Sequence, residues 1–229
     1  MFGMLQPDRT VNRLAATVIV VRDGSSGLET LMLKRPSTGS FADAWVWPGG
    51  AVEAVDRDGE HAASEVESYI ARRAGVRETE EETGLRLDPE SMVAHAIWSP
   101  PEGVSPRFRT WFFMAPDPGG EPVACEDEAT ALEWVRPADM LDAHACEQLT
   151  LVVPTWVTLH QMRDSGTVAE ALDRCANEPF EHFETRAREG DRFCWFGDAA
   201  FEDEAGTGTG RHRLETATRP WRYITEPGR

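Results

Sequence analysis

The feature of this sequence that most constrains its fold is an acidic segment at residues 77–85, RETEEETGL. Four glutamates fall within five positions, and neighbouring charges of one sign repel each other. On a helix, where successive residues are rotated by about 100°, Glu78, Glu81 and Glu82 share one face and Glu80 points away from it. This face must therefore meet either solvent or a cation.

A cation would resolve the crowding of these three carboxylates. Ionised carboxylates that lie close together raise one another's pKa unless a positive charge neutralises them. Hard divalent cations such as Mg²⁺ and Mn²⁺ take oxygen ligands, which suits a face formed by Glu78, Glu81 and Glu82. Acidic helix faces are common, however, so the rest of the sequence has to decide between a metal site and a solvated surface.

The composition limits the classes of function. The 229 residues are 41% hydrophobic, enough for one core with or without an extension. The 40 acidic and 23 basic residues give a net charge of −17, which disfavours nucleic acids and anionic membranes as partners. The sequence has no run of about 18 apolar residues and no secretory signal, so we expect no membrane span. Four scattered cysteines without a Cys-x-x-Cys pair are typical of reduced thiols, and we expect a cytoplasmic protein.

Apolar periodicity predicts both strands and helices, an α+β chain. A β-branched run at 14–21, the turn sequence DGSSG and a second strand-like segment at 28–35 predict a β-hairpin. A short strand then leads into Pro48, Gly49 and Gly50, where the backbone must turn tightly.

A helix is expected from about residue 62 to Thr83, where Gly84 ends it. Gly75 lies inside this helix and costs about 1 kcal/mol relative to alanine, so a start near Val76 is the alternative. Residues 179–190 show no clear pattern. Further strands are expected at 92–98, 107–115, 131–137, 190–196 and 212–224, and further helices at 137–149, 154–164 and 167–178.

The Pro-Gly-Gly turn and the acidic segment together resemble the signature of the Nudix hydrolases. In that signature a glycine, five residues, a glutamate and seven residues precede an Arg-Glu-aliphatic-any-Glu-Glu-any-Gly-aliphatic block. Gly50 matches the first glycine. The closing block is matched by Arg77, Glu78, Glu81, Glu82, Gly84 and Leu85. The resemblance covers about residues 14–136 and implies a Nudix α/β/α sandwich with a mixed sheet at 10–145, with 146–229 as a helical and strand extension packed on the same domain.

The chain departs from the Nudix signature at three places. Asp56 stands where the first glutamate is expected, and Thr79 stands where an aliphatic residue is usual. Twenty residues, 57–76, replace the seven-residue spacer, which implies an insertion at about 57–68. The aspartate and the long spacer are similar to a branch that contains the peroxisomal CoA diphosphatases. The segments AVEAVDRD and WSPPEGVSPRFRTWFFMA also resemble that branch in part.

The resemblance assigns Glu78, Glu81 and Glu82 to metal binding, with Gly49 and Gly50 forming the wall of the metal and substrate site. The expected cofactor is Mg²⁺ or Mn²⁺. An ion bridging the diphosphate would explain how so acidic a chain accepts an anion.

The general base stays open, because members of the family take it from the helix or from a later loop. Glu128 lies six residues before Trp134, a spacing at which the family often carries a loop glutamate, and it is the first candidate. On the helix, Glu82 is the catalytic candidate. Asp127 and Glu53 are alternatives.

Arginines are the expected partners of these acids and of the substrate phosphates. Arg77 is expected to orient the glutamates through Glu81, its i+4 neighbour. Arg35 and Arg109, with Arg107 as an alternative to the latter, are candidate phosphate anchors, because guanidinium binds phosphate in a bidentate way.

The resemblance implies a metal-dependent pyrophosphohydrolase that cleaves the diphosphate linkage of a nucleoside diphosphate derivative. CoA or acyl-CoA is the leading substrate. ADP-ribose, other nucleotide sugars, dinucleotides and damaged nucleotides are alternatives. A Nudix-fold module that senses a nucleotide without turnover is an alternative of another class. Members of the family often form homodimers, although the sequence identifies no dimer face.

Overall fold

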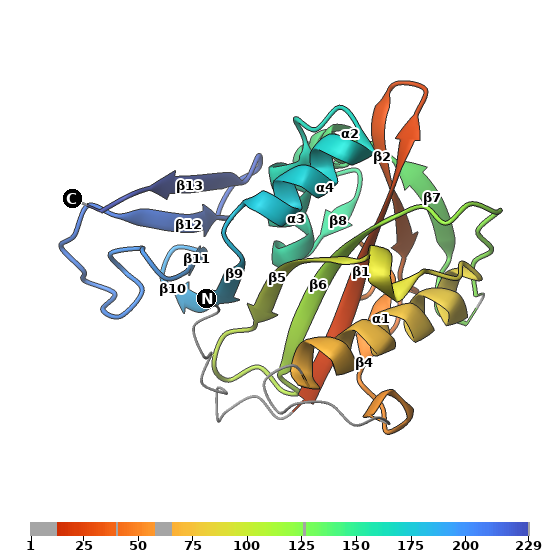
Figure 1. Cartoon of the computed structure of the whole chain (residues 1–229). Helices are drawn as coiled ribbons and strands as arrows, with labels where there is room; N and C mark the ends of the chain where they lie inside the picture. The colour runs from red at the N-terminus through yellow and green to blue at the C-terminus, as the bar shows by residue number, and fades with distance from the viewer. Residues whose placement is uncertain (1–12, 40, 58–65, 126, 229) are drawn as a thin grey trace.

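A computed structural model describes the chain at residues 13–39, 41–57, 66–125 and 127–228. Its centre is the predicted hairpin, in which β1 (Arg13–Gly24) pairs antiparallel with β2 (Gly27–Lys34) (Figure 1). Among these described residues, no helix is long and apolar enough to cross a membrane.

The main sheet extends from β1 in one direction through three strands. These are β6 (Phe108–Pro116), β5 (Val93–Ser99) and β9 (Glu181–Glu184). β6 runs parallel to β1, β5 runs antiparallel to β6, and β9 runs parallel to β5, so the sheet is mixed as predicted.

On the other side of the hairpin the sheet is shorter and carries the turn that faces the acidic helix. β2 pairs with β3 (Ala44–Val46) and with β7 (Ala131–Val135), and β3 pairs in turn with β8 (Thr150–Leu151). β4 (Gly49–Ala51) returns to pair antiparallel with β1. This return brings the Pro-Gly-Gly turn to the middle of the molecule.

The two faces of β1 serve two cores, because successive strand residues point in opposite directions. Ala16, Val18 and Val20 pack in one core with α1 (Val66–Thr83). Ile19 and Val21 pack in the other core with residues of α2 (Pro137–Ala145), α3 (Val153–Met162) and α4 (Val168–Asn177). Helices therefore cover both faces of the sheet, which confirms the predicted α+β sandwich.

α1 carries the acidic segment and runs without interruption through Gly75. A start at Val76 is therefore wrong, while residues 62–65 and most of the expected insertion at 57–68 lie outside the described residues. A Cβ on Gly75 would lie 2.8 Å from a methyl group of Val18, so glycine lets the helix pack closely on β1. After Thr83 the helix ends at Gly84, which has a φ of +71°, as predicted.

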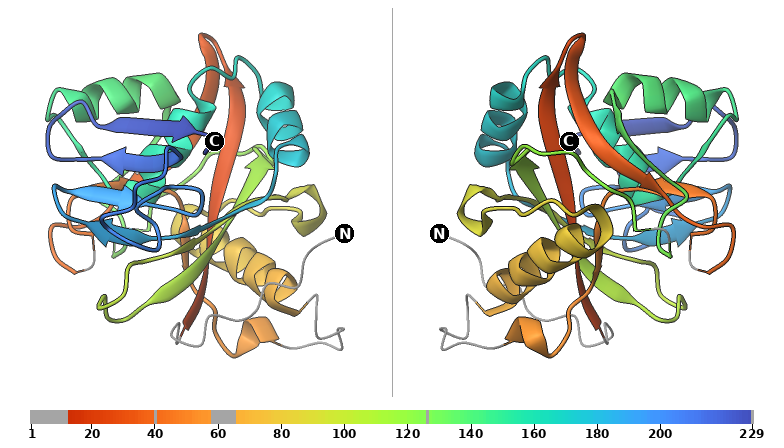
Figure 2. Two further views of the ribbon diagram at one scale, coloured as in Figure 1. Left: turned by 90° about the vertical axis from the view of Figure 1, so that its left-hand side faces the viewer. Right: turned by 90° about the vertical axis from the view of Figure 1, so that its right-hand side faces the viewer.

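The C-terminal part of the chain adds a second, four-stranded sheet. The unassigned region 179–190 forms β9 and β10 (Arg186–Arg188), and β10 opens a sheet that continues with β11 (Arg192–Cys194), β12 (Arg211–Glu215) and β13 (Arg222–Glu226). Figure 2 shows this sheet and α1 on opposite sides of the β1–β2 hairpin. Trp195 and Leu214 are fully buried in the core shared with α2 to α4. The division into a domain at 10–145 and an extension at 146–229 stays a prediction.

His144, in the last turn of α2, is fully buried beside Trp221, with their ring centroids 4.4 Å apart. Neither of its ring nitrogens has a hydrogen-bond partner among the described residues. Burial, and then the charge of Arg219, lower the pKa of His144 to about 4. Because an unfolded histidine has a pKa near 6.5, the folded state binds fewer protons between about pH 4 and 6.5. Stability is therefore fully present above about pH 6.5 and is lost as the pH falls towards 4.

We expect this histidine to make the chain sensitive to mild acid. When the pH is lowered from about 7 to about 5, protonation of His144 in the unfolded chain should reduce the free energy of unfolding by about 2 kcal/mol. Urea denaturation at the two pH values measures this loss. His144→Leu removes the titrating group and keeps an apolar side chain, so it should lose less stability over the same pH interval. Equal losses in the two proteins would show that another group is responsible.

Candidate active site

The last turns of α1 face the Pro-Gly-Gly turn at close range. In the pairing of β4 with β1, Gly49 lies opposite Thr17 and Gly50 lies opposite Ala16. Gly49 has a φ of +154°, and a Cβ there would collide with the carbonyl oxygen of Ala16. A Cβ on Gly50 would lie 2.5 Å from the carboxylate of Glu78. Gly49 therefore requires glycine because its neighbours are backbone atoms of β1, whereas a side chain at Gly50 would displace the flexible carboxylate of Glu78.

Three carboxylates converge beside this turn. Glu78, Glu82 and Glu128 each offer an oxygen atom, and these atoms lie within 4.8 Å of one another. Glu82 accepts a hydrogen bond from the N–H of Gly49 at 2.8 Å. Glu128 comes from the loop between β6 and β7, which is tied to the end of α1 because the N–H of Cys125 donates to the carbonyl oxygen of Glu82 at 3.1 Å. We call these three residues the carboxylate cluster.

The carboxylate cluster holds more negative charge than its surroundings offset. The side chain of Glu82 is only 2% exposed. Burial raises the pKa of Glu82 to about 8, the hydrogen bond from Gly49 opposes this rise, and the neighbouring Glu128 adds to it. Burial also raises the pKa of Glu78, against the opposing charge of Arg77. A divalent cation would offset this crowding. The residues fit Mg²⁺ or Mn²⁺, because they supply hard oxygen donors and Gly50 leaves the Glu78 carboxylate room.

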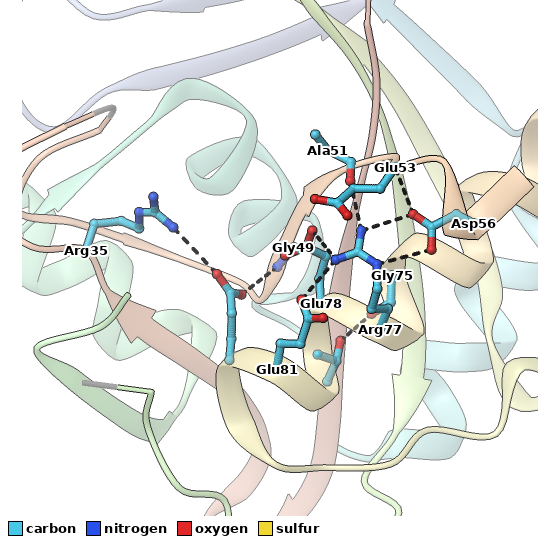
Figure 3. A network of polar contacts seen from close by, with 11 residues as sticks. Arg35, Gly49, Ala51, Glu53, Asp56, Gly75, Arg77, Glu78 and Glu81 are labelled. Atoms are coloured by element: carbon cyan, nitrogen blue, oxygen red, sulfur yellow. Dashed lines mark hydrogen bonds and ion pairs between the residues drawn. The ribbon is translucent and has the colours of Figure 1, made fainter. Parts of the chain in front are cut away.

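Arg77 binds the acids on one side of the cluster (Figure 3). Its guanidinium donates to both carboxylate oxygens of Asp56, at 3.2 and 3.0 Å. It also donates to Glu78 at 2.8 Å and to Glu81 at 2.9 Å. A fifth hydrogen bond, at 3.0 Å, reaches the carbonyl oxygen of Ala51 in β4. Arg77 therefore joins the acidic helix to the Pro-Gly-Gly turn, and Glu81 is one of its partners as predicted.

Arg35 lies on the opposite side of the cluster from Arg77 (Figure 3). It follows β2, and its Nη1 atom is 3.5 Å from the Oε1 atom of Glu82. Its side chain is 31% exposed, so this guanidinium meets both the cluster and solvent. The guanidinium of Arg35 therefore places positive charge beside Glu82, but the two groups are farther apart than in a close ion pair.

Two predicted site residues do not belong to the carboxylate cluster. The side chain of Glu81 is 55% exposed and is held by Arg77. Arg109 pairs at 3.0 Å with Glu67, in the first turn of α1. At a rise of 1.5 Å per residue, Glu67 lies about 16 Å along the helix from Glu78, so the structure does not bring Arg109 to the cluster.

The alternative candidates do not belong to the carboxylate cluster. Asp127 and Glu53 are exposed, and the N–H of Glu53 donates to Asp56 at 2.8 Å. Arg107 donates to the carbonyl oxygen of Pro100 at 2.7 Å.

Two of the departures from the signature have a structural role that sequence reasoning missed. Asp56 is 3% exposed, and both of its oxygens bind Arg77, so it positions this arginine. In the sequence, the only sign of this role was that Asp56 lies six residues after Gly50, where the signature has its first glutamate. Thr79 is fully buried, and its hydroxyl donates to the carbonyl oxygen of Gly75 at 2.7 Å, which lets a polar residue occupy an aliphatic position.

Comparisons with known proteins identify the family of the chain. The NUDIX domain family matches residues 11–155, more than half of the chain. The chain therefore belongs to the NUDIX domain family, and with it to the class of Nudix pyrophosphohydrolases, as predicted. No curated protein matches the sequence.

Two solved structures show the same fold. A NUDIX hydrolase from Alicyclobacillus acidocaldarius has a TM-score of 0.62 at 22% identity, over 73% of this chain and 98% of that one. The NUDIX domain of Shewanella oneidensis NrtR, solved in complex with ADP ribose, has a TM-score of 0.50 at 16% identity, over 66% of this chain and 86% of that one. At such identities the likeness concerns the fold alone.

Proposed function

We propose that this chain cleaves the diphosphate linkage of a nucleoside diphosphate derivative with the help of Mg²⁺ or Mn²⁺. The supporting observation is the convergence of Glu78, Glu82 and Glu128, with oxygen atoms within 4.8 Å of one another, beside the Gly49–Gly50 turn. A bound divalent ion supplies positive charge to the phosphoryl oxygens and lowers the pKa of a bound water. That charge also lets a chain with a net charge of −17 accept an anionic substrate.

Each residue has its own task in this proposal. Glu78, Glu82 and Glu128 hold the ion, and Glu81 stands at the rim, bound by Arg77. Glu128 is the first candidate for the general base, because it lies on a loop at the cluster and has an oxygen close to both helix carboxylates. Arg77 positions the helix carboxylates and does not itself face the substrate.

Arg35 is the proposed anchor for a substrate phosphate. Its guanidinium is part-exposed and only loosely paired with Glu82, so an arriving phosphate can compete for it. A cation held by Glu82 would weaken the attraction between Glu82 and Arg35, which would leave the guanidinium available to a phosphate. Arg109, which is 7% exposed in its side chain and paired with Glu67, takes no part in this proposal.

CoA or an acyl-CoA is the proposed substrate, and its support comes from sequence. The segments AVEAVDRD and WSPPEGVSPRFRTWFFMA resemble the CoA diphosphatase branch of the family in part. Cleavage would yield phosphopantetheine, or its acylated form, and adenosine 3′,5′-bisphosphate.

A substrate panel tests this proposal. Purified protein with Mg²⁺ is incubated with CoA, ADP-ribose, a dinucleotide and a nucleoside triphosphate, and the products are separated by chromatography. We expect Mg²⁺-dependent cleavage of CoA with a higher kcat/KM than for the other compounds, and no cleavage after chelation. If the protein cleaves ADP-ribose but not CoA, CoA is not its substrate and ADP-ribose takes its place. If no diphosphate is turned over, the chain is a nucleotide-sensing module instead.

A further inference from the structure

A cavity separate from the carboxylate cluster lies between β5, β9, α4 and the loop that follows β11. Its volume is about 630 Å³, and its wall includes residues of α3 and α4, whose core is on the opposite face of the sheet from α1. No lysine or arginine is among the described residues that line it. The wall instead combines aromatic rings with glutamates, chiefly Phe180, Phe196, Phe201, Glu178, Glu181 and Glu184.

A β-bulge places His95 in the wall of this cavity. In the pairing of β5 with β6, Ala94 lies opposite Phe113 and Ala96 lies opposite Phe112, so His95 between them is the extra residue. Bulges of this kind redirect a side chain out of the regular ladder. The imidazole Nε2 of His95 is buried and has no hydrogen-bond partner among the described residues. Burial lowers the pKa of His95 to about 4, so the ring is neutral at pH 7.

The glutamates of the wall only accept hydrogen bonds when ionised, whereas its histidines and Gln161 can both donate and accept. The side chain of Gln161 hydrogen-bonds with His95 and carries both a donor and an acceptor. Glu178 is exposed, and its contact with Arg174 is long at 3.8 Å. Glu181 lies 3.2 Å from a ring nitrogen of His212. A neutral imidazole adds one further acceptor. These carboxylates, with no lysine or arginine among the lining residues, favour a ligand whose hydrogen-bond donor is positively charged.

The aromatic part of the wall suits a cation as well. Phe196 is 79% exposed, and its ring lies edge-on to Phe201 with 6.2 Å between the centroids. The guanidinium of Arg186 stands 5.0 Å from the centroid of Phe201 and pairs with Glu184 at 2.7 Å. A carboxylate and an aromatic ring thus already share a cation next to the cavity, and the exposed ring of Phe196 is open to a ligand.

We propose that this cavity binds an organic ammonium ion with an aromatic or other apolar body. The ammonium group lies between Glu178 and Glu181, on the side of the cavity lined by His95 and Gln161, while the apolar body packs against Phe196. A phosphate or carboxylate of the same size is excluded by the glutamates. The site is independent of the proposed hydrolysis, because none of the three cluster residues lines the cavity.

Calorimetric titration of the full chain with three compounds of one shape tests this proposal. The probes are 2-phenylethylamine, which is a cation near pH 7.5, the neutral 2-phenylethanol and the anionic phenylacetate, all in saturating Mg²⁺. We expect the amine to bind at least tenfold more tightly than the alcohol and the anion not to bind. Equal binding of the three compounds, or no saturable binding of the amine, would overturn the proposal.

Matched variants test whether the amine binds in this cavity. Glu178→Gln should weaken its binding at least threefold, and Phe196→Ala should do the same by removing the exposed ring. Asp173→Asn makes the same change of charge at an exposed position of α4 that does not line the cavity, and it should bind like wild type. If Glu82→Gln abolishes amine binding and Glu178→Gln leaves it unchanged, the amine binds at the carboxylate cluster and the proposed site is wrong.

Discussion

Glu82→Gln is expected to lower kcat for Mg²⁺-dependent diphosphate hydrolysis by about 10²–10³-fold while leaving the fold intact. The amide has the size of the carboxylate, and its oxygen can still accept the hydrogen bond from Gly49. It cannot supply negative charge to a divalent ion. Steady-state kinetics on the preferred substrate gives the loss in kcat.

The same variant should not lose stability when metal is absent. Burial gives Glu82 a pKa of about 8, above its unfolded value near 4.5, so the folded state binds more protons between these values. The cost of ionising this buried group grows as the pH rises through that window. Glutamine carries no such cost, and the free energy of unfolding at about pH 8 should be equal to or above that of wild type.

Glu80→Gln is the matched control for this experiment. Glu80 is on the same helix, its side chain is 44% exposed and it pairs with Arg86 at 2.7 Å. The control should keep the kcat of wild type and its affinity for Mn²⁺ in a calorimetric titration. If Glu82→Gln behaves like this control in both assays, the carboxylate cluster is not the metal site and the proposed mechanism fails.

Helical periodicity predicted part of the carboxylate cluster. The i, i+4 spacing put Glu78 and Glu82 on one face, and both belong to the cluster. Glu81 shares that face on an ideal helix, but Arg77, four residues earlier, binds its carboxylate at the rim. Glu128 comes from a loop far along the chain, and only tertiary folding brings it to the helix. Its spacing ahead of a later strand was the one signal that the sequence held.

Local patterns were sufficient where a segment has clear boundary signals, as in the β1–β2 hairpin with its DGSSG turn and at the end of α1 before Gly84. They were insufficient for residues 179–190, because β9 and β10 are short and depend on pairing with β5 and β11. The position of Arg109 on β6 was predicted, but its partner was not. A strand pattern does not say which end of α1 lies beside each residue, and Arg109 meets Glu67 at the far end.

Arg77→Met is expected to lower the free energy of unfolding by about 3–5 kcal/mol, because it leaves the carboxylate of Asp56 buried without its cation. Asp56 is 3% exposed and receives two of the five hydrogen bonds that Arg77 donates. Loss of the guanidinium also frees Glu78 and Ala51, so the affinity for Mn²⁺ should fall with the stability. Urea denaturation and a Mn²⁺ titration give the two values.

A double-mutant cycle separates this pair from a general loss of packing. Asp56→Asn combined with Arg77→Met removes both charges, and the combination should cost clearly less than the sum of the two single changes. Arg86→Met is the control, because Arg86 is 84% exposed and pairs with Glu80 at the same end of α1. An exposed pair contributes at most about 1 kcal/mol, so this control should stay near wild type. A loss in Arg77→Met no larger than in Arg86→Met would mean that the contacts of Arg77 do not hold the carboxylates in place.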